Sequence, residues 1–543
     1  MKKRLLKKGA AAVVLALVLT SCSAAERTKE VSVSQPTQID FEIDPDYSTN
    51  WWKDQPNGNS MVDPDWDGSG LMLTANEVSE GITITDLETG EPVKYIQGEG
   101  TPHHIHMNKE QTWAFATQRY GSSVLAIDME TLEAKEITFP GMGEKPGPLH
   151  LAFSHDGKYA FVALNSAGAV AKIDANKAEF IEVIEGVGER PRDLAVTPDG
   201  KKLYVSNQAS PFIAVVDLDT NKVRHLERTK SDYGKGTGSG LDMSNDGKYV
   251  AVSNTLDNEV AVYDTKTDKL IEKIGDIPGP VNVSFMGESN YLATGNRSDG
   301  STSIVDTERW TLVDTIETGG GTNIPYLGPD GLWYTSQNGA GFLTVIDPDD
   351  HFRITRKIWG VQNIHWLYWA PDGKTMFGTN WGEKKVTKVD MTKRKDFRET
   401  YLVGLNPNGI ALYTDVSEEK LEEFRNNNEG VAETVEKAST LVIPEPRDER
   451  EEAFLGTCLQ CHDIGRIMRN NNKGDQWSAT VDRMQGNGAQ MTDESKKLIV
   501  EYLKSNQHKS LEIQTQLMEE LSEGKGNNKA EQPEEQTEDK EKK

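Results

Sequence analysis

Cysteine is almost absent from this sequence. Only Cys22, Cys458 and Cys461 occur among its 543 residues, and the last two are separated by just two positions. This count excludes the small secreted folds that depend on several disulfides. Long apolar runs are also scarce, because no stretch beyond residues 9–19 comes close to the length of a membrane span.

Positive charge is the second shortage. The chain has 60 Lys and Arg against 86 Asp and Glu, which gives a formal net charge of -26 at pH 7. A surface of this sign repels phosphate backbones and other copies of the chain. The composition therefore argues against nucleic acid as a partner and favours a well-solvated protein.

The N-terminus is typical of an export signal. Residues 1–8 are rich in Lys and Arg, and the apolar residues 9–19 follow them. The segment ends in Leu19-Thr20-Ser21-Cys22, which resembles the bacterial lipobox. The resemblance implies that residues 1–21 are removed as a lipoprotein signal peptide and that lipid is attached to Cys22. We therefore expect an extracytoplasmic protein that is lipid-anchored to the cell membrane, with the polar residues 22–60 as a tether.

Residues 61–415 are dominated by an internal repeat. Short β-branched runs end in an aspartate every 41 to 47 residues, at Asp86, Asp128, Asp174, Asp217, Asp264, Asp306, Asp347 and Asp390. Asp-Gly pairs, which favour hairpin turns, precede further strands in most units. The 3.6-residue spacing of a helical repeat is missing. The period predicts an all-β propeller of eight blades, with seven as the alternative.

The two ends of the repeat predict how the ring closes. Residues 408–412 have the pattern of an innermost strand with no outer strands after it, whereas residues 70–95 have the pattern of outer strands with no inner strand before them. Pairing them makes one shared blade and removes an exposed sheet edge. Units such as residues 190–207, RPRDLAVTPDGKKLYVSN, resemble the YVTN-type propeller family. That resemblance covers nearly the whole repeat region and implies a fold rather than a chemistry.

The sequence Cys458-Leu459-Gln460-Cys461-His462 has the spacing of a c-type haem attachment site. In this interpretation the two thiols bond to the porphyrin and the histidine ligates the iron. A thioredoxin-type redox pair needs a βαβ context, and a zinc site needs a second ligand pair. Neither is evident, so residues 446–508 are expected to form a small all-α cytochrome c domain with one covalent haem. Residues 416–445 are expected to link it to the propeller, and residues 509–543 to form a helical and then disordered tail.

A methionine is the expected second axial ligand of the iron. The run from Trp477 to Met484, a glycine turn and a closing helix resemble the small monohaem cytochromes attached to sulfite and amine dehydrogenases. The resemblance points to Met484, with Met491 as the alternative. A thioether opposite histidine raises the reduction potential and favours electron transfer. An eight-bladed ring joined to a c-type haem is also similar to the haem d1 nitrite reductases, although there the cytochrome precedes the propeller.

The propeller offers one cluster of candidate residues. Aligning the start of each inner strand gives one equivalent position per blade: His104, His150, Asp193, Gly240, Asn282, Pro325, His365 and Gly409. At Pro325 and His365 the sequence leaves the register of the alignment undecided by one residue. Inner strands line the central channel, so His104, His150, Asp193 and His365 are expected to converge near its mouth, with His103 and His106 beside them. Imidazoles and a carboxylate suit a metal, a haem-like cofactor or acid–base chemistry, but they equally suit polar packing of a channel.

Three hypotheses for function follow. In the first, the protein is a membrane-anchored c-type cytochrome for electron transfer, and the propeller docks a redox protein partner. In the second, the propeller is itself an oxidoreductase with a second cofactor of unknown identity, and the haem c relays its electrons. In the third, the propeller is a binding scaffold and the haem a sensor. The sequence leaves open whether the protein is an enzyme.

Overall fold

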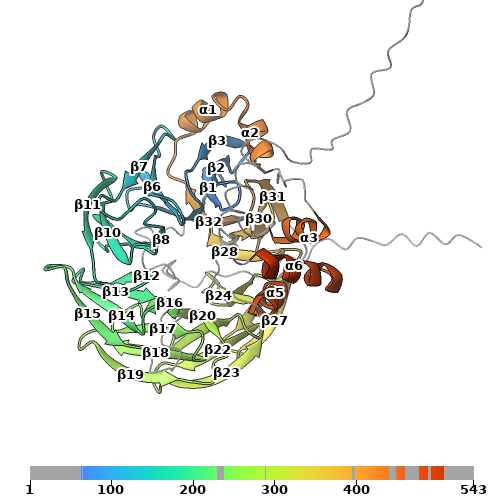
Figure 1. The fold of residues 1–543 in the computed structure, drawn as a ribbon. Helices are drawn as coiled ribbons and strands as arrows, with labels where there is room; N and C mark the ends of the chain where they lie inside the picture. The colour runs from blue at the N-terminus through green and yellow to red at the C-terminus, as the bar shows by residue number, and fades with distance from the viewer. Residues whose placement is uncertain are drawn as a thin grey trace, which may run out of the picture.

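A computed structural model describes residues 63, 65–228, 238–287, 289–393, 398–439, 448–458, 476–486 and 491–506. Thirty-two strands form eight antiparallel four-stranded sheets arranged around a central axis (Figure 1). The chain is thus an eight-bladed β-propeller, which confirms the larger of the two predicted blade numbers. The residues expected to form the signal peptide and the tether, including Cys22, lie outside the described ranges.

Each blade runs from an inner strand outwards. The inner strands are β4 (Pro102–Met107), β8 (Pro148–Phe153), β12 (Pro191–Val196), β16 (Gly238–Met243), β20 (Pro280–Phe285), β24 (Thr322–Leu327), β28 (Ile364–Trp369) and β32 (Pro407–Tyr413). The second strands are β5 (Trp113–Gln118), β9 (Tyr159–Leu164), β13 (Lys202–Asn207), β17 (Tyr249–Asn254), β21 (Tyr291–Asn296), β25 (Trp333–Gln337), β29 (Thr375–Asn380) and β1 (Leu71–Asn76).

The outer half of each blade repeats in the same way. The third strands are β6 (Ser123–Asp128), β10 (Ala169–Asp174), β14 (Phe212–Asp217), β18 (Glu259–Asp264), β22 (Ser301–Asp306), β26 (Phe342–Asp347), β30 (Lys385–Asp390) and β2 (Gly81–Asp86). The fourth strands are β7 (Ala134–Thr138), β11 (Glu179–Ile184), β15 (Lys222–Glu227), β19 (Lys269–Ile274), β23 (Thr311–Glu317), β27 (Arg353–Trp359), β31 (Arg398–Leu402) and β3 (Pro92–Gln97).

The ring closes by a shared blade, as the sequence predicted. Strand β32, from the end of the repeat region, pairs antiparallel with β1 from its start, so that Leu73 lies opposite Ala411. The blade therefore has the order β3-β2-β1-β32. This pairing satisfies the backbone groups of both terminal strands and joins the first blade to the last.

The repeating aspartates stabilise turns. Each one ends the third strand of its blade, and in the described turns its side chain accepts backbone N–H groups of the turn that follows. An aspartate that accepts these bonds stabilises the turn into the fourth strand. The glycines of the Asp-Gly pairs, such as Gly157 and Gly200, have positive φ angles of 73° and 70°. Glycine adopts this left-handed conformation without the steric cost that a side chain adds.

Apolar side chains from neighbouring blades form the core. The inner three strands of each blade are largely buried, whereas outer strands such as β27 alternate between exposed and half-buried residues. Close packing near the axis requires glycine at Gly409, where a Cβ atom would lie 2.7 Å from the backbone oxygen of His103. The inner strands of adjacent blades are therefore in near backbone contact here, which fixes the positions of the residues near the axis.

Two helices follow the last propeller strand within the segment assigned to a linker. Helix α1 (Glu418–Asn426) buries Leu421 and Phe424 in a core cluster of the closing blade. Helix α2 (Val431–Ala438) comes next, and Ser439 at its end donates its hydroxyl to the backbone oxygen of Val403 at 2.7 Å. These contacts attach residues 418–439 to the ring.

Three more helices are described in the C-terminal region. They are α3 (Glu449–Cys458), α5 (Gln476–Gly486) and α6 (Asp493–Asn506). Among the described residues, no helix combines the length and hydrophobicity of a membrane span.

Candidate functional site

A hydrogen bond repeated from blade to blade fixes the register of the inner strands. The backbone N–H of the third inner-strand residue donates to a serine or threonine hydroxyl of the second strand, in the pairs His104–Thr117, Asp193–Ser206, Gly240–Ser253, Ile324–Ser336 and Trp366–Thr379. The third residues are therefore structurally equivalent. His104, His150 and Asp193 hold this position, as predicted. In two blades the predicted alignment is one residue off, because Ile324 rather than Pro325 and Trp366 rather than His365 occupy it.

The structure brings three histidines together near the axis of the ring. His103, His104 and His150 each place a ring nitrogen within 4.8 Å of the others. His104 stacks on His150 with ring centroids 3.8 Å apart, and the His103 and His150 centroids are 5.5 Å apart. All three are at most 6% exposed. The expected convergence of imidazoles is thus present for two of the predicted residues, with the neighbouring His103 as the third.

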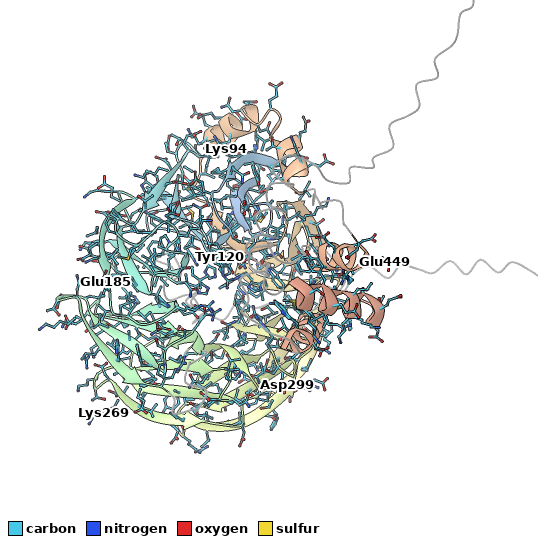
Figure 2. The ribbon with its side chains drawn as sticks, viewed as in Figure 1. Lys94, Tyr120, Glu185, Lys269, Asp299 and Glu449 are labelled. Carbon is cyan, nitrogen blue, oxygen red and sulfur yellow. The ribbon has the colours of Figure 1, made fainter. Side chains whose placement is uncertain are left out.

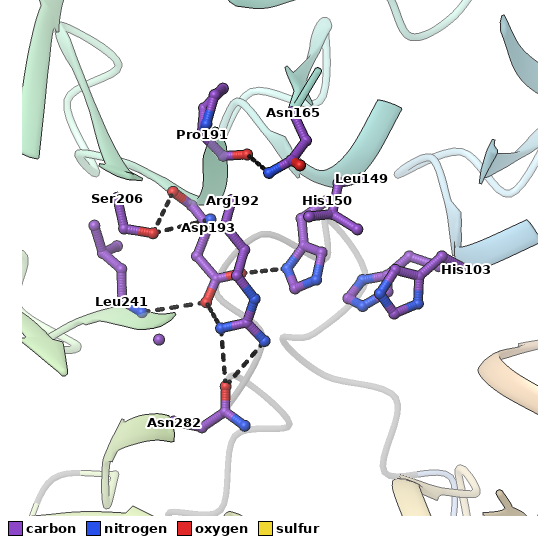
Figure 3. A network of polar contacts seen from close by, with 12 residues as sticks. His103, Leu149, His150, Asn165, Pro191, Arg192, Asp193, Ser206, Leu241 and Asn282 are labelled. Carbon is purple, nitrogen blue, oxygen red and sulfur yellow. Dashed lines mark hydrogen bonds and ion pairs between the residues drawn. The ribbon is translucent and has the colours of Figure 1, made fainter. Parts of the chain in front are cut away.

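Two carboxylates, one half-buried and one buried, lie beside these imidazoles. His150 Nδ1 pairs with Asp193 Oδ1, and Figure 3 shows His150 lying between Asp193 and His103. On the other side, His103 Nδ1 lies 3.3 Å from Glu77 Oε1. His104 Nδ1 lies 3.3 Å from His106 Nε2. Each of the three histidines therefore has one ring nitrogen held by a neighbouring side chain.

Glu77 is almost completely enclosed at 3% exposure. Its carboxylate accepts hydrogen bonds from Asn406 Nδ2 at 2.8 Å, Asn408 Nδ2 at 3.0 Å and Trp381 Nε1 at 3.3 Å. These three donors hold the carboxylate in place. Glu77 follows strand β1 of the closing blade, so it reaches the histidines only because that blade joins both ends of the repeat region.

Two arginines flank the carboxylates. Arg119 Nη1 lies 3.3 Å from His103 Nε2 and 4.0 Å from Glu77 Oε1. Tyr120, the next residue, lies near the middle of the ring, whereas Lys269 lies at its outer edge (Figure 2). Arg192 Nη1 lies 3.3 Å from Asp193 Oδ2. Two guanidinium groups thus balance the charge of two carboxylates in a site of low exposure.

Burial lowers the pKa of His104, His106 and His150 and keeps these three imidazoles neutral at ordinary pH. Burial lowers the pKa of His104 well below its usual value, and the neighbouring histidines lower it further. Burial also lowers the pKa of His150, although Asp193 opposes the shift, and burial lowers the pKa of His106 to about 3. Burial alone would raise the pKa of Asp193, but Arg192 and His150 outweigh it and lower that pKa. Asp193 is therefore ionised beside the uncharged imidazoles of His104 and His150.

His365 belongs to a different set of contacts. Its Nδ1 lies 3.1 Å from Asn338 Oδ1, and its ring lies 5.7 Å from that of Trp381. The neighbouring Trp366 occupies the inner-strand position that was predicted for His365, and it packs edge-on against His104 with ring centroids 4.6 Å apart. His365 is thus not part of the three-histidine cluster.

Sequence reasoning missed Glu77 and Arg119. Each is the first residue after a second strand, a position that the inner-strand alignment does not include. A comparison of the residues that follow each second strand would have found them. Glu77 meets His103 and Arg119 of the neighbouring blade, a contact that no local pattern reveals.

The predicted haem-binding residues are only partly described. Cys458 is the last residue of helix α3, whereas Cys461 and His462 lie outside the described ranges. Met484 lies on helix α5 and Met491 lies shortly before helix α6, and both are half-buried. The choice between these two methionines stays a prediction.

Comparisons with known proteins agree with the propeller fold. A family model described as lactonase, 7-bladed beta-propeller, matches residues 83–237. The chain is 25% identical over 280 residues to the uncharacterized protein YncE of Salmonella typhimurium, and the alignment covers 50% of this chain and 78% of that protein. It is also 25% identical over 229 residues to a 6-phosphogluconolactonase of an Enterobacter species, covering 38% of this chain and 68% of that enzyme.

One solved structure extends the comparison. The dihydro-heme d1 dehydrogenase NirN, in complex with DHE, superposes with a TM-score of 0.50 at 16% identity, over 66% of this chain and 77% of that chain. At this identity the likeness concerns the fold alone. The chain is therefore a β-propeller similar in fold to NirN and in sequence to YncE and lactonase propellers.

Proposed function

We propose that this protein is an extracytoplasmic electron-transfer protein that carries one covalent haem c in its C-terminal region. The observation that carries the proposal is the motif from Cys458 to His462, which begins where helix α3 ends. In this proposal Cys458 and Cys461 hold the porphyrin and His462 ligates the iron. Covalent haem cycles between two iron oxidation states without leaving the protein, which suits transfer of single electrons.

The helices beside the motif support a small cytochrome domain. Phe454 of α3 stacks on Tyr502 of α6 with centroids 4.5 Å apart, and the Tyr502 hydroxyl donates to Glu451 Oε1 at 3.0 Å. Trp477 of α5 is buried, and its Nε1 has no hydrogen-bond partner among the described residues. A buried indole N–H of this kind can donate a hydrogen bond to a polar group of a bound cofactor, such as a haem propionate.

Met484 is the proposed second ligand of the iron, and Met491 is the alternative. Both side chains are half-buried in the described part of this region. Histidine and methionine together leave no open position on the iron, so the haem would relay electrons rather than bind a substrate.

The propeller is the proposed docking platform for a redox protein partner. Lipid on Cys22 would hold the protein at the outer surface of the cell membrane, and residues 22–60 would give the propeller reach. A second function, catalysis in the propeller itself, is favoured by one observation: nitrogen atoms of three buried imidazoles lie within 4.8 Å of one another beside two carboxylates.

An anaerobic redox titration of the full-length protein tests the first function. We expect one haem per chain with a low-spin c-type spectrum and a single one-electron transition. His462→Ala should abolish the low-spin spectrum, whereas His351→Ala, whose side chain is 98% exposed, should preserve it. A wild-type spectrum in His462→Ala would refute the ligand assignment, and a protein without haem would refute the function.

A further inference from the structure

Two ring nitrogens in the three-histidine cluster have no visible partner. His104 Nε2 and His150 Nε2 are fully shielded from solvent and make no hydrogen bond to any described residue. Buried polar atoms of this kind are uncommon in native proteins and call for an explanation such as a bound ion. Both imidazoles come from equivalent positions of adjacent inner strands and stack on one another, with centroids 3.8 Å apart.

The opposite nitrogens of the rings are held in the manner of metal ligands. A histidine that binds a metal through one nitrogen usually donates its other N–H to a carboxylate or another acceptor, which fixes the ring orientation. His150 Nδ1 pairs with Asp193, and His103 Nδ1 lies 3.3 Å from Glu77. His104 Nδ1 lies 3.3 Å from a ring nitrogen of His106. The cluster thus has both the ligands and the side chains that orient them.

We propose that His103, His104 and His150 bind one divalent transition-metal ion of the zinc or copper class. Imidazole nitrogen is a preferred ligand of both ions, whereas magnesium and calcium prefer oxygen. Three protein ligands also leave one position of a tetrahedral ion free for water or a substrate. This site is separate from the proposed haem and goes beyond the electron-transfer function.

The geometry requires a small closure. Nitrogens bound to a tetrahedral ion at about 2.1 Å lie about 3.4 Å apart. The three ring nitrogens here lie within 4.8 Å of one another, so the rings must move together by roughly 1 Å on binding. Rotation of the imidazoles about their side-chain torsions is the movement that this closure requires.

Arg119 sets the affinity of the proposed site. Its Nη1 lies 3.3 Å from His103 Nε2, and a cation there competes with the metal for the same nitrogen. Glu77 and Asp193 carry the negative charge that offsets Arg119 and Arg192. The site before binding is therefore close to neutral, so the ion gains no large electrostatic attraction and depends on the three nitrogen ligands.

Metal analysis and zinc titration of the full-length protein provide the test. After removal of metal with a chelator, ZnCl2 is titrated by calorimetry while the haem content is measured independently. We expect one zinc per chain in the wild type and loss of that binding in His104→Ala and in His150→Ala. Asp193→Asn should weaken zinc affinity by about tenfold to 100-fold, because it removes the partner that orients His150.

His365→Ala is the matched control, because this channel histidine belongs to another set of contacts. It should bind zinc like the wild type. Absence of zinc binding by the folded wild type, or an equal loss in His365→Ala, would overturn the proposal. If His150→Ala fails to fold, CuCl2 added to the wild type decides the matter: nitrogen coupling in the copper EPR spectrum supports the site, and a spectrum of oxygen ligands alone contradicts it. Because haem and zinc are counted separately, failure of one assignment leaves the other standing.

Discussion

Arg425 joins helix α1 to a buried carboxylate of the closing blade. Its Nε donates to Asp86 Oδ2 at 2.7 Å, and its two terminal nitrogens donate to Glu418 and Glu88 at 2.7 and 2.8 Å. Asp86 is 0% exposed, and its other oxygen accepts the turn N–H groups of Glu88 and Thr89. We predict that Arg425→Ala destabilises the propeller, because it leaves this carboxylate buried without its cation.

The magnitude follows from the exposure of the pair. Breaking a fully buried ion pair costs about 3–5 kcal/mol, whereas an exposed pair contributes less than about 1 kcal/mol. The Arg425 side chain is 21% exposed, so we expect an intermediate loss of about 2 kcal/mol. An unfolding entropy of about 2.1 cal/mol/K per residue over roughly 350 residues converts this into a fall in Tm of about 3 °C.

Urea denaturation and calorimetry of the wild type and Arg425→Ala measure this loss of stability. Arg309→Ala is a matched control, since Asp306 occupies the equivalent place in another blade and Arg309 is 76% exposed. The control should change the free energy of unfolding by less than about 0.5 kcal/mol. Equal effects of the two substitutions, or no effect of Arg425→Ala, would show that α1 does not depend on this buried pair.

Three further predictions concern the axis of the ring and the haem. Burial lowers the pKa of His106 to about 3, so between about pH 6.5 and 3 this imidazole takes up a proton only in the unfolded chain. The free energy of unfolding should therefore be full above pH 6.5 and fall by up to roughly 5 kcal/mol on acidification. His106→Gln should reduce this pH dependence, as measured by urea denaturation. Gly409→Ala should cost about 1–3 kcal/mol in the same assay, since its Cβ would lie 2.7 Å from neighbouring backbone, whereas Gly275→Ala meets no atom within 4 Å and should be close to neutral. Met484→Ala should remove the weak long-wavelength absorption of methionine-ligated ferric haem, and its loss in Met491→Ala instead would reverse the ligand assignment.

The regular parts of the fold could be predicted because each repeat carries local turn chemistry. The aspartate that ends every third strand marks each blade in the sequence, and a glycine with positive φ after the inner strand marks most of them. The shared closing blade could also be predicted, since Pro407–Tyr413 lacks outer strands of its own. Helices α1 and α2 lie within residues 416–445, which were expected only to link two domains, because the burial of Leu421 and Phe424 depends on the folded ring.

The candidate site was predictable only in part. His104, His150 and Asp193 share one register position, so an alignment of blades finds them. His365 was placed one residue off, because the structure puts Trp366 at that position. Glu77 depends on closure of the ring, which brings together residues more than 300 positions apart, as its bond with Asn406 shows. Contacts of this range follow from the fold as a whole and leave no trace in a local pattern.

Mass spectrometry of the exported protein tests the central claim most directly. The protein should be made in cells able to mature c-type cytochromes and analysed after denaturation, so that only covalent groups remain. We predict a mass that exceeds the lipidated polypeptide by one haem, and loss of that increment when Cys458 and Cys461 are both replaced by alanine. A mass equal to the polypeptide and its lipid alone would contradict the account.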